Sequence, residues 1–274
     1  MREDLLRRAA ALLRLPSSPE RVPEVTSGGS GLRCPATRTE FVHRDGILDL
    51  LPDNGPMTIG QRALDTAVTA WLYDRARESI LKLAGLPDFA TEVDNIRSRL
   101  QPRPGDVVVD LACGHGNFTM EWARLVGPDG LVIGLDLSRS MLARAAARVA
   151  ASRATNVLLI HGDAHHLPIA SASVARVNCS GGFHAFPELP RALAEIARIS
   201  VAGGLLTASM FAENPAHPYP RLRELLRVQL GLHFVPLLWL GEQLRAVGYT
   251  EYAWTAPKSG FGYASAVRAS APLH

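Results

Sequence analysis

Apolar residues recur along this chain with two different periods. Five short runs rich in Val, Leu and Ile, typical of buried strands, cover residues 107–111, 131–137, 156–160, 175–180 and 205–211. Segments whose apolar residues recur every three to four positions, as on one face of a helix, cover residues 117–126, 139–152 and 189–200. Parallel strands need crossover connections, so this alternation predicts an α/β protein with a parallel sheet and helices on both faces.

Further elements flank this core. Residues 249–254 and 263–270 have the composition of two late strands, and helices are expected over residues 58–85, 91–100 and 237–248. We assign the whole unit to a main domain over residues 56–274. No period of 20 to 50 residues recurs, so a repeat architecture is not expected.

The first 55 residues follow another pattern. Residues 3–15 place their leucines on one stripe of an amphipathic helix, residues 16–31 are rich in Pro, Ser and Gly like a linker, and residues 32–52 hold two short β-prone pieces around a turn. We therefore predict a small helical and hairpin appendage over residues 1–55. Its helix fits packing on its own domain, covering of a ligand cleft, or pairing with another subunit, so a homo-oligomer stays open.

Composition limits the classes of function. Of 274 residues, 47% are hydrophobic and 20% charged, which favours a globular protein. The net charge of +3 comes from scattered arginines without a basic tract, so nucleic-acid binding is permitted but not indicated. The cysteines are widely spaced and no His, Cys or acidic cluster suggests a metal. With neither a secretory signal nor an apolar run of membrane-spanning length, the chain is expected to be cytoplasmic.

The turn after the first strand of the alternation carries specific chemistry. Asp110 ends the strand VVVDL, and Gly114-His115-Gly116 opens directly into a helix whose first N–H groups can meet a ligand. A dinucleotide-binding loop would have a third glycine, and an acid beside the loop would repel phosphates. The turn therefore favours a ligand with a positive amine or sulfonium and no phosphate over the cofactor of a dinucleotide oxidoreductase.

Two more acids end the next two strands. Asp136 lies 22 residues after Gly114, close to the roughly 20 expected of an acid that hydrogen-bonds ribose hydroxyls. Asp163 follows the third strand, where a carboxylate could accept the exocyclic amine of an adenine. Each acid alone fits a helix cap or a turn. Three acids in successive βα units indicate a nucleoside ligand.

The chain resembles a known family in four ordered segments: VVVDLACGHGNFT, GLDLSRSML, GDAHHLPIASASVARVNCSGGFHAF and ALAEIARISVAGGLL. They are similar to the signature segments of class I S-adenosylmethionine-dependent methyltransferases of the ubiquinone-methylase-like group. The resemblance spans about residues 104–211. It implies S-adenosyl-L-methionine as the cofactor and a Rossmann-like, seven-stranded, mostly parallel sheet, which the two late strands close as an antiparallel pair.

The resemblance also implies roles for individual residues. It assigns Asp136 to the ribose with Leu137 beside the adenine, Asp163 with Ala164 to the adenine amine, and Cys179 to the methionine moiety. The cofactor loop would consist of Asp110, Ala112, Cys113, Gly114 and Gly116. Ala112 stands where the family more often has glycine.

The acceptor side is less defined. His184, after the fourth strand, is the candidate general base, with shaping of its loop as the alternative, because an ordinary histidine pKa of about 6.5 suits proton removal at neutral pH. One of His165 and His166 is expected to face solvent, and His115 either faces the cofactor's carboxylate or lies at the surface. Residues 212–240 stand where the family inserts substrate-covering elements. Core packing or an apolar or aromatic acceptor would explain their large side chains, namely His217, Tyr219, His233, Phe234 and Trp239.

The segment LRCPATRTEFVHRDGILDLLP is similar to the zinc-ribbon lead-in of some methyltransferases, including ribosomal RNA guanine methylases. Only Cys34 of the expected cysteines is present. One cysteine cannot build a tetrahedral thiolate site, so we predict no zinc.

The leading hypothesis is methyl transfer to carbon or oxygen of a small, largely apolar metabolite. The arginine- and alanine-rich composition resembles that of high-GC bacteria, which suggests secondary metabolism and natural-product biosynthesis. An RNA base methyltransferase is the first alternative, although Asn178-Cys179-Ser180-Gly181 lacks the [D/N]PP[Y/F] motif of amino-methylating nucleic-acid enzymes. The second alternative is a protein of this fold that binds the cofactor without transferring the methyl group.

Overall fold

A single mixed sheet organises the computed structural model, which describes residues 2–15, 21–51, 66, 87–213, 233–256 and 260–270. Among these residues the sheet has 11 strands in the order β1-β2-β3-β4-β7-β6-β5-β8-β9-β11-β10. The strands are β1 (Glu24–Val25), β2 (Gly31–Arg33), β3 (Glu40–Arg44), β4 (Ile47–Asp49), β5 (Val107–Leu111), β6 (Leu131–Asp136), β7 (Val157–His161), β8 (Val174–Ser180), β9 (Ser200–Phe211), β10 (Tyr249–Thr255) and β11 (Phe261–Arg268).

The predicted seven-stranded sheet is confirmed as the part built from β5 to β11. Strands β7, β6, β5, β8 and β9 pair in parallel, and β11 and β10 close the sheet as an antiparallel pair. The chain builds outward from β5 first in one direction and then in the other. Ligands of open α/β sheets bind beyond the carboxyl ends of the strands at such a reversal, so β5 marks where to look for a site.

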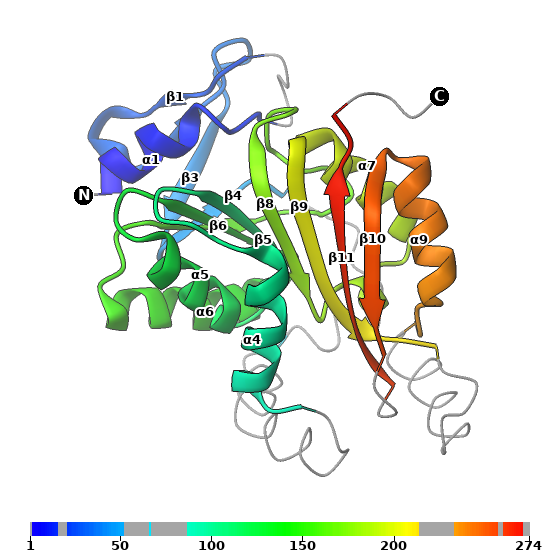
Figure 1. Ribbon diagram of the computed structural model, residues 1–274. Helices are drawn as coiled ribbons and strands as arrows, with labels where there is room; N and C mark the ends of the chain where they lie inside the picture. Colours follow the sequence, from blue (N-terminus) through cyan, green and yellow to red (C-terminus); the bar gives the residue numbers. More distant parts are fainter. Residues whose placement is uncertain are drawn as a thin grey trace.

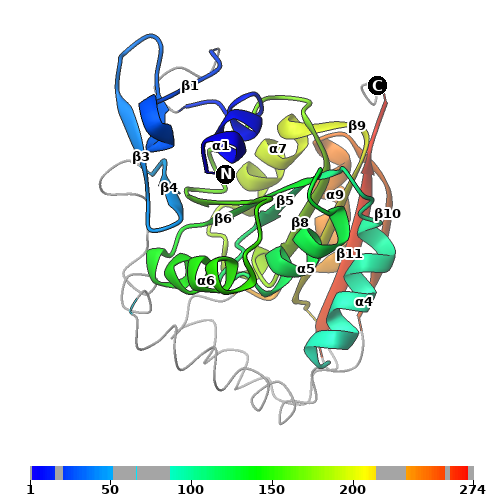
Figure 2. The same cartoon turned by 90° about the vertical axis from the view of Figure 1, so that its left-hand side faces the viewer.

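Helices cover both faces, as predicted. Alternate side chains of one strand point to opposite faces, so Val108 packs with α4 (Phe89–Leu100) and α5 (Asn117–Val126), whereas Val109 belongs to the core beneath α7 (Leu189–Ile199). Figure 2 shows α4, α5 and α6 (Arg139–Ser152) on one side of the sheet and α1 (Arg2–Ala10) and α7 on the other. The helix α9 (Leu237–Ala246) packs beside β10 (Figure 1).

The N-terminal hairpin is part of the sheet. Strands β3 and β4 pair in antiparallel register around Asp45 and Gly46, which both have positive φ, 53° and 83°, as a tight hairpin turn requires. Strand β4 then pairs in parallel with β7. The linker prediction for residues 16–31 is wrong in part, because β1 and the first residue of β2 lie in this range. The boundary predicted at residue 55 and the helix predicted over residues 58–85 fall outside the described residues, apart from residue 66.

The first helix packs on its own domain. Leu6, Ala9 and Leu13 are fully or almost fully buried in the core that also holds α7. The Leu12 carbonyl accepts from the Ala170 N–H at 2.7 Å, which fixes the residues after α1 beside those that lead into β8. Oligomeric state and cytoplasmic location stay predictions. No helix in the described ranges is long and apolar enough to cross a membrane.

Candidate active site

The loop between β5 and α5 has a strained backbone that glycine accommodates. Gly114 and Gly116 have φ of 53° and 82°, in the left-handed region. A Cβ on Gly116 would lie 2.9 Å from the Cβ of Ala145, whereas one on Gly114 would meet nothing within 4 Å. Gly116 therefore lets α5 pack against α6, and Gly114 leaves its own backbone open to a ligand.

Ala112 also has a positive φ, 50°, which explains why a glycine would suit this position. Gly182, after β8, makes room for the alanine. A Cβ on Gly182 would lie 2.8 Å from the Ala112 Cβ and 2.5 Å from the Cys179 Sγ. Ala112 of the loop after β5, Cys179 of β8 and Gly182 of the loop after β8 thus fit together only because Gly182 has no side chain.

The Asp136 carboxylate joins two loops. One oxygen accepts from the Gly114 N–H at 2.7 Å and the other from the Ser138 N–H at 2.8 Å. Ser138 in turn caps α6, because its hydroxyl accepts from the Met141 N–H. Asp136 is therefore held at the carboxyl edge of the sheet, beside the open backbone of Gly114. A carboxylate has about four acceptor positions, so these bonds are compatible with further donors from a ligand.

Asp110 lies beneath the loop and does not project beside it. Its side chain is buried and accepts from the Thr119 hydroxyl at 2.6 Å and from the Asn178 amide at 2.7 Å. The Thr207 hydroxyl donates to the same Asn178 at 3.1 Å, so the bonds form a row across β5, β8 and β9. Burial raises the pKa of Asp110 to about 6, against the hydrogen bonds from Thr119 and Asn178. The carboxyl group of Asp110 thus joins the end of β5 to α5, through Thr119, and to β8, through Asn178.

Asp163 is held by the two histidines that follow it. One oxygen accepts from the backbone and from the ring Nδ1 of His165, at 2.9 and 2.7 Å, and the other oxygen contacts His166 Nδ1 at 3.3 Å. Burial alone would raise the pKa of Asp163, but these hydrogen bonds and the His165 charge lower it to about 2. The His166 side chain is 63% exposed and that of His165 only 13%, which confirms that one of the pair faces solvent.

Cys113, Cys179, Ala164 and His115 are all buried, and Leu137 lies between Asp136 and the start of α6. Burial raises the pKa of both thiols well above the ordinary value, so they stay protonated and apolar. Of the two alternatives for His115, surface exposure is not what the structure has.

His184 is enclosed in the short helix η2 (Phe183–Ala185). Its carbonyl accepts from the His233 N–H at 2.7 Å, and its ring Nδ1 accepts from the Phe211 N–H at 3.4 Å. Burial lowers the pKa of His184 to about 4, so the ring is neutral at pH 7. With Nδ1 accepting, the ring hydrogen resides on Nε2. The predicted role as general base stays a prediction, and both features favour a hydrogen-bond donor or a packing role.

Sequence reasoning missed a cluster of aromatic rings at the carboxyl end of β9. The Phe211 ring centroid lies 4.8 Å from that of His184 and 5.7 Å from those of Phe234 and Phe261. Tyr263 continues the cluster, 5.7 Å from Phe261. Of these rings, the sequence predicts only His184, as the candidate base, and Phe234, in the segment 212–240. Trp239 packs against the core, and His217 and Tyr219 lie outside the described residues.

Sequence reasoning also missed a buried carboxylate on α4. Glu92 is 2% exposed and accepts from the Ser209 hydroxyl at 2.8 Å. Ser209 stands in register with Ser180 of β8 and Tyr263 of β11, so Glu92 lies over the β8–β9–β11 side of the sheet. A signal was present in the sequence: Glu92 falls on the same stripe of α4 as Val93 and the other buried apolar residues.

Comparisons with known proteins bear on these residues. Residues 108–204 match the family described as the methyltransferase domain. The demethylmenaquinone methyltransferase of Shouchella clausii (strain KSM-K16) is 30% identical over 156 residues, which are 57% of this chain and 63% of that protein. This part of the chain is therefore similar to a methyltransferase domain, as the resemblance of the sequence predicts. The chain spans less than two thirds of the length of this and the next curated relatives.

Solved structures show the methyltransferase fold. Phosphoethanolamine N-methyltransferase 2 of Haemonchus contortus, in complex with S-adenosyl-L-methionine, has a TM-score of 0.64 at 15% identity and covers 80% of this chain and 62% of its own. The [4+2]-cyclase SpnF has a TM-score of 0.58 at 18% identity and covers 78% of this chain and 97% of its own. At these identities the likeness concerns the fold alone.

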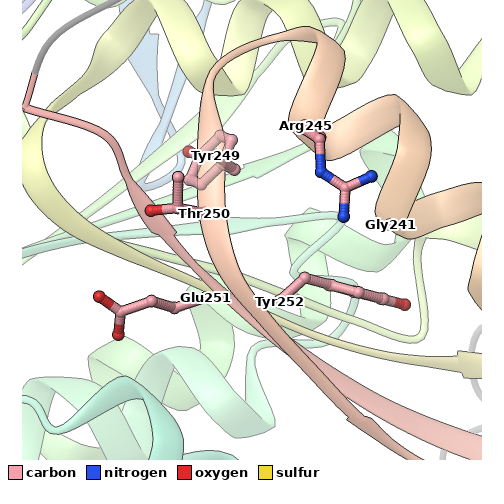
Figure 3. A pocket seen from close by; sticks show the side chains of 6 residues that line it. All are labelled: Gly241, Arg245, Tyr249, Thr250, Glu251 and Tyr252. Carbon is pink, nitrogen blue, oxygen red and sulfur yellow. The ribbon is translucent and has the colours of Figure 1, made fainter. Parts of the chain in front are cut away.

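The segment that matches the methyltransferase family contains all predicted cofactor residues and His184, but neither Glu92 nor Ser209. A hollow of about 190 Å³ between α9 and β10, lined by Arg245 and Tyr252, is a separate feature (Figure 3). It includes Tyr249, which pairs with Arg268 near the amino end of β9. This hollow is therefore remote from the glycine loop of the methyltransferase domain.

Proposed function

We propose that this chain binds S-adenosyl-L-methionine and transfers its methyl group to carbon or oxygen of a small, largely apolar molecule. The observation that carries the proposal is the Asp136 carboxylate, held against the open backbone of Gly114 by a 2.7 Å hydrogen bond. An acid in this place suits the ribose hydroxyls of a nucleoside ligand.

The chemistry of the donor set fits the proposed cofactor. Asp136 would hold the ribose, Leu137 and Ala164 would border the adenine, and Asp163 would accept its amine. The open backbone at Gly114, the half-buried Ala112 and the buried Cys179 would border the methionine moiety. The group supplies an electrophilic methyl on a sulfonium when bound. What this chain's residues do is bind, orient and exclude water, so that the acceptor atom stands in line with the methyl group.

The acceptor would lie against the aromatic cluster at the end of β9. Phe211 and Phe234 are half-buried and pack with the buried Phe261, and this apolar surrounding supports an aromatic or isoprenoid-like acceptor. Glu92, with Ser209, supplies a polar group on the same side of the sheet. An acceptor of this kind would have an apolar body and one hydroxyl or acidic carbon, as many natural products do.

Proton removal is needed when the acceptor is a hydroxyl. Glu92 is our first candidate for accepting that proton, because its side chain lies on the same side of the sheet as the aromatic cluster and contacts Ser209 of β9. His184 is the second candidate, since its low pKa makes it a weak base at neutral pH. The two can be separated by substitution.

The hydrogen bonds and the burial of Asn178 favour a small molecule over a nucleobase as the acceptor. Its amide donates to Asp110 and its carbonyl accepts from Thr207 and Ser180, all within the sheet. It is fully buried and therefore does not present polar groups to an incoming base. Salt-sensitive RNA binding with methyl incorporation would reverse this preference.

The proposal is tested by incubating the full chain with methyl-labelled S-adenosyl-L-methionine and a panel of apolar phenols, quinols and isoprenoid alcohols. We expect one acceptor to gain a labelled methyl, with S-adenosylhomocysteine formed in equal amount. Asp136→Ala tests whether this acid is needed for cofactor binding. Asp129→Ala, at an exposed acid in a turn, is the matched control and should leave binding unchanged. Cofactor binding with a converted but unlabelled product would favour the alternative of a rearrangement without transfer.

A further inference from the structure

A chain of hydrogen bonds runs from the N-terminal hairpin to the loop after β6. Asp49, the last residue of β4, stands in register with His161 of β7, and His161 stands in register with Asp136 of β6. The three side chains therefore belong to one edge of the sheet, where the carboxyl ends of three parallel strands meet. No segment of the matched family region includes Asp49.

The His161 ring connects Asp49 of the N-terminal hairpin with the loop after β6. Its Nδ1 lies 2.9 Å from an Asp49 carboxylate oxygen and its Nε2 lies 3.2 Å from the Leu137 carbonyl oxygen. The Arg139 guanidinium, at the start of α6, binds the other oxygen of Asp49. The His161 side chain is only 14% exposed, so protein groups more than water decide its hydrogen bonds.

Both partners of the His161 ring are acceptors. A carboxylate oxygen and a carbonyl oxygen have no hydrogen to donate, so both ring nitrogens must carry hydrogen for both bonds to exist. That species is the imidazolium ion. The neighbouring Asp49 carboxylate would stabilise the positive charge of that species. Partial burial alone would raise the pKa of Asp49, but its contacts with His161 and Arg139 lower it.

The carbonyl that His161 contacts belongs to the loop between β6 and α6. Leu137 follows Asp136, whose carboxylate accepts from Gly114 and Ser138. The backbone at this point is held from the other side as well, since the Gly162 N–H donates to the Asp136 carbonyl at 3.1 Å. The direction of the Leu137 peptide therefore depends on β7 and, through Asp49, on the N-terminal hairpin.

We propose that Asp49 and His161 are positioning residues for cofactor binding, with Asp49 holding His161 as the imidazolium whose Nε2–H fixes the Leu137 carbonyl and thereby Asp136. The N-terminal hairpin thus completes the nucleoside side of the site. This inference rests on the proposed function only in taking S-adenosylhomocysteine as the ligand. It differs from a merely structural link between β4 and β7, which would affect stability and leave affinity unchanged.

The test is calorimetric titration of the full chain with S-adenosylhomocysteine. We expect His161→Gln to weaken binding about tenfold and Asp49→Asn about threefold. Each substitution removes a charged hydrogen bond from the series that orients Asp136. The double variant should be no weaker than His161→Gln by more than about twofold, since both residues act through the same bond. The matched control is Glu40→Gln, which removes an exposed ion pair with Arg33 in the same hairpin and should leave affinity unchanged.

Two outcomes would overturn the inference. One is wild-type affinity in folded His161→Gln and Asp49→Asn proteins, whatever the loss of thermal stability. The other uses no variant: nitrogen NMR of the wild-type ring at pH 7 showing His161 neutral. If the wild-type chain does not bind S-adenosylhomocysteine at all, the proposed function fails first, while the NMR measurement still decides the state of the ring.

Discussion

The two halves of the sheet's carboxyl edge differ in their chemistry. Over β5, β6 and β7, three carboxylates are tied to backbone N–H groups, hydroxyls and histidines within a few residues of the strand ends. Over β8, β9 and β11, aromatic rings gather at the end of β9, and one buried glutamate, Glu92, reaches the sheet from α4. The first half suits a fixed polar ligand such as a nucleoside, and the second suits an apolar molecule with one reactive group.

Under the proposed function, the two halves would bind their ligands in different ways. The polar half consists of loop residues that the strands themselves position. The apolar half consists of side chains from separate elements, which can be exchanged without altering the loop. The substitutions below ask whether the halves are as separate as their contacts suggest.

The largest effect is expected from the backbone of the cofactor half. Gly116→Ala should cost about 3 kcal/mol of unfolding free energy, because it adds left-handed strain and a 2.9 Å approach to Ala145. Gly105→Ala is the matched control, with a φ of 85° but open space around it, and should cost only about 1 to 2 kcal/mol. Denaturant unfolding measures both. Equal costs would show that the α5–α6 contact is not tight.

The next effect belongs to the acceptor half. Glu92→Gln should lower kcat about a hundredfold with the affinity for S-adenosylhomocysteine unchanged, because the amide keeps the shape and cannot take a proton. Steady-state kinetics with the acceptor found above, together with titration of the cofactor product, separate the two quantities. A parallel loss of cofactor affinity would mean that the two halves are not separate.

Asp110 links the two halves through its hydrogen bond with Asn178 of β8. Its raised pKa should make the free energy of unfolding depend on pH. Its folded pKa of about 6 lies above the unfolded value of about 3.9, so the folded chain holds this proton more tightly. The stabilising contribution is present below about pH 4 and is lost, by about 2 to 3 kcal/mol, as the pH rises to about 6. Unfolding of wild type and Asp110→Asn across this range measures it. Parallel curves would contradict the raised pKa.

The smallest effect is expected at His184. With a pKa lowered to about 4 by burial, the ring is already neutral, and His184→Gln should keep an N–H donor. We expect less than about a tenfold loss of turnover, whereas loss of a general base would cost about a hundredfold or more. The pH profile of kcat supplies the second readout. A hundredfold loss in a folded variant would return His184 to the role of base.

The two halves also differ in how far the sequence predicts them. The acids Asp110, Asp136 and Asp163 follow strands that periodicity alone locates, so their common edge could be inferred. The burial of Asp110 could not, because its partner Asn178 lies 68 residues away and the contact depends on the β5–β8 register.

Long-range pairing explains the other omissions. The Glu92–Ser209 contact joins residues 117 positions apart, and the Asp49–His161 contact joins residues 112 positions apart. The sequence predicts the β3–β4 hairpin from its Asp-Gly turn, but only the fold reveals that β4 pairs with β7. Local patterns thus predicted elements and loops, and the contacts between distant elements required the structure.

Titration of wild type, Asp136→Ala and Asp129→Ala with S-adenosylhomocysteine decides whether Asp136 binds the cofactor. We expect one site in wild type, unchanged affinity in the Asp129→Ala control, and a loss of about 1.5 to 3 kcal/mol in Asp136→Ala from the missing charge-assisted hydrogen bonds. Absence of binding to wild type, or equal affinity in folded Asp136→Ala, would contradict the assignment of this carboxylate as the centre of the cofactor site.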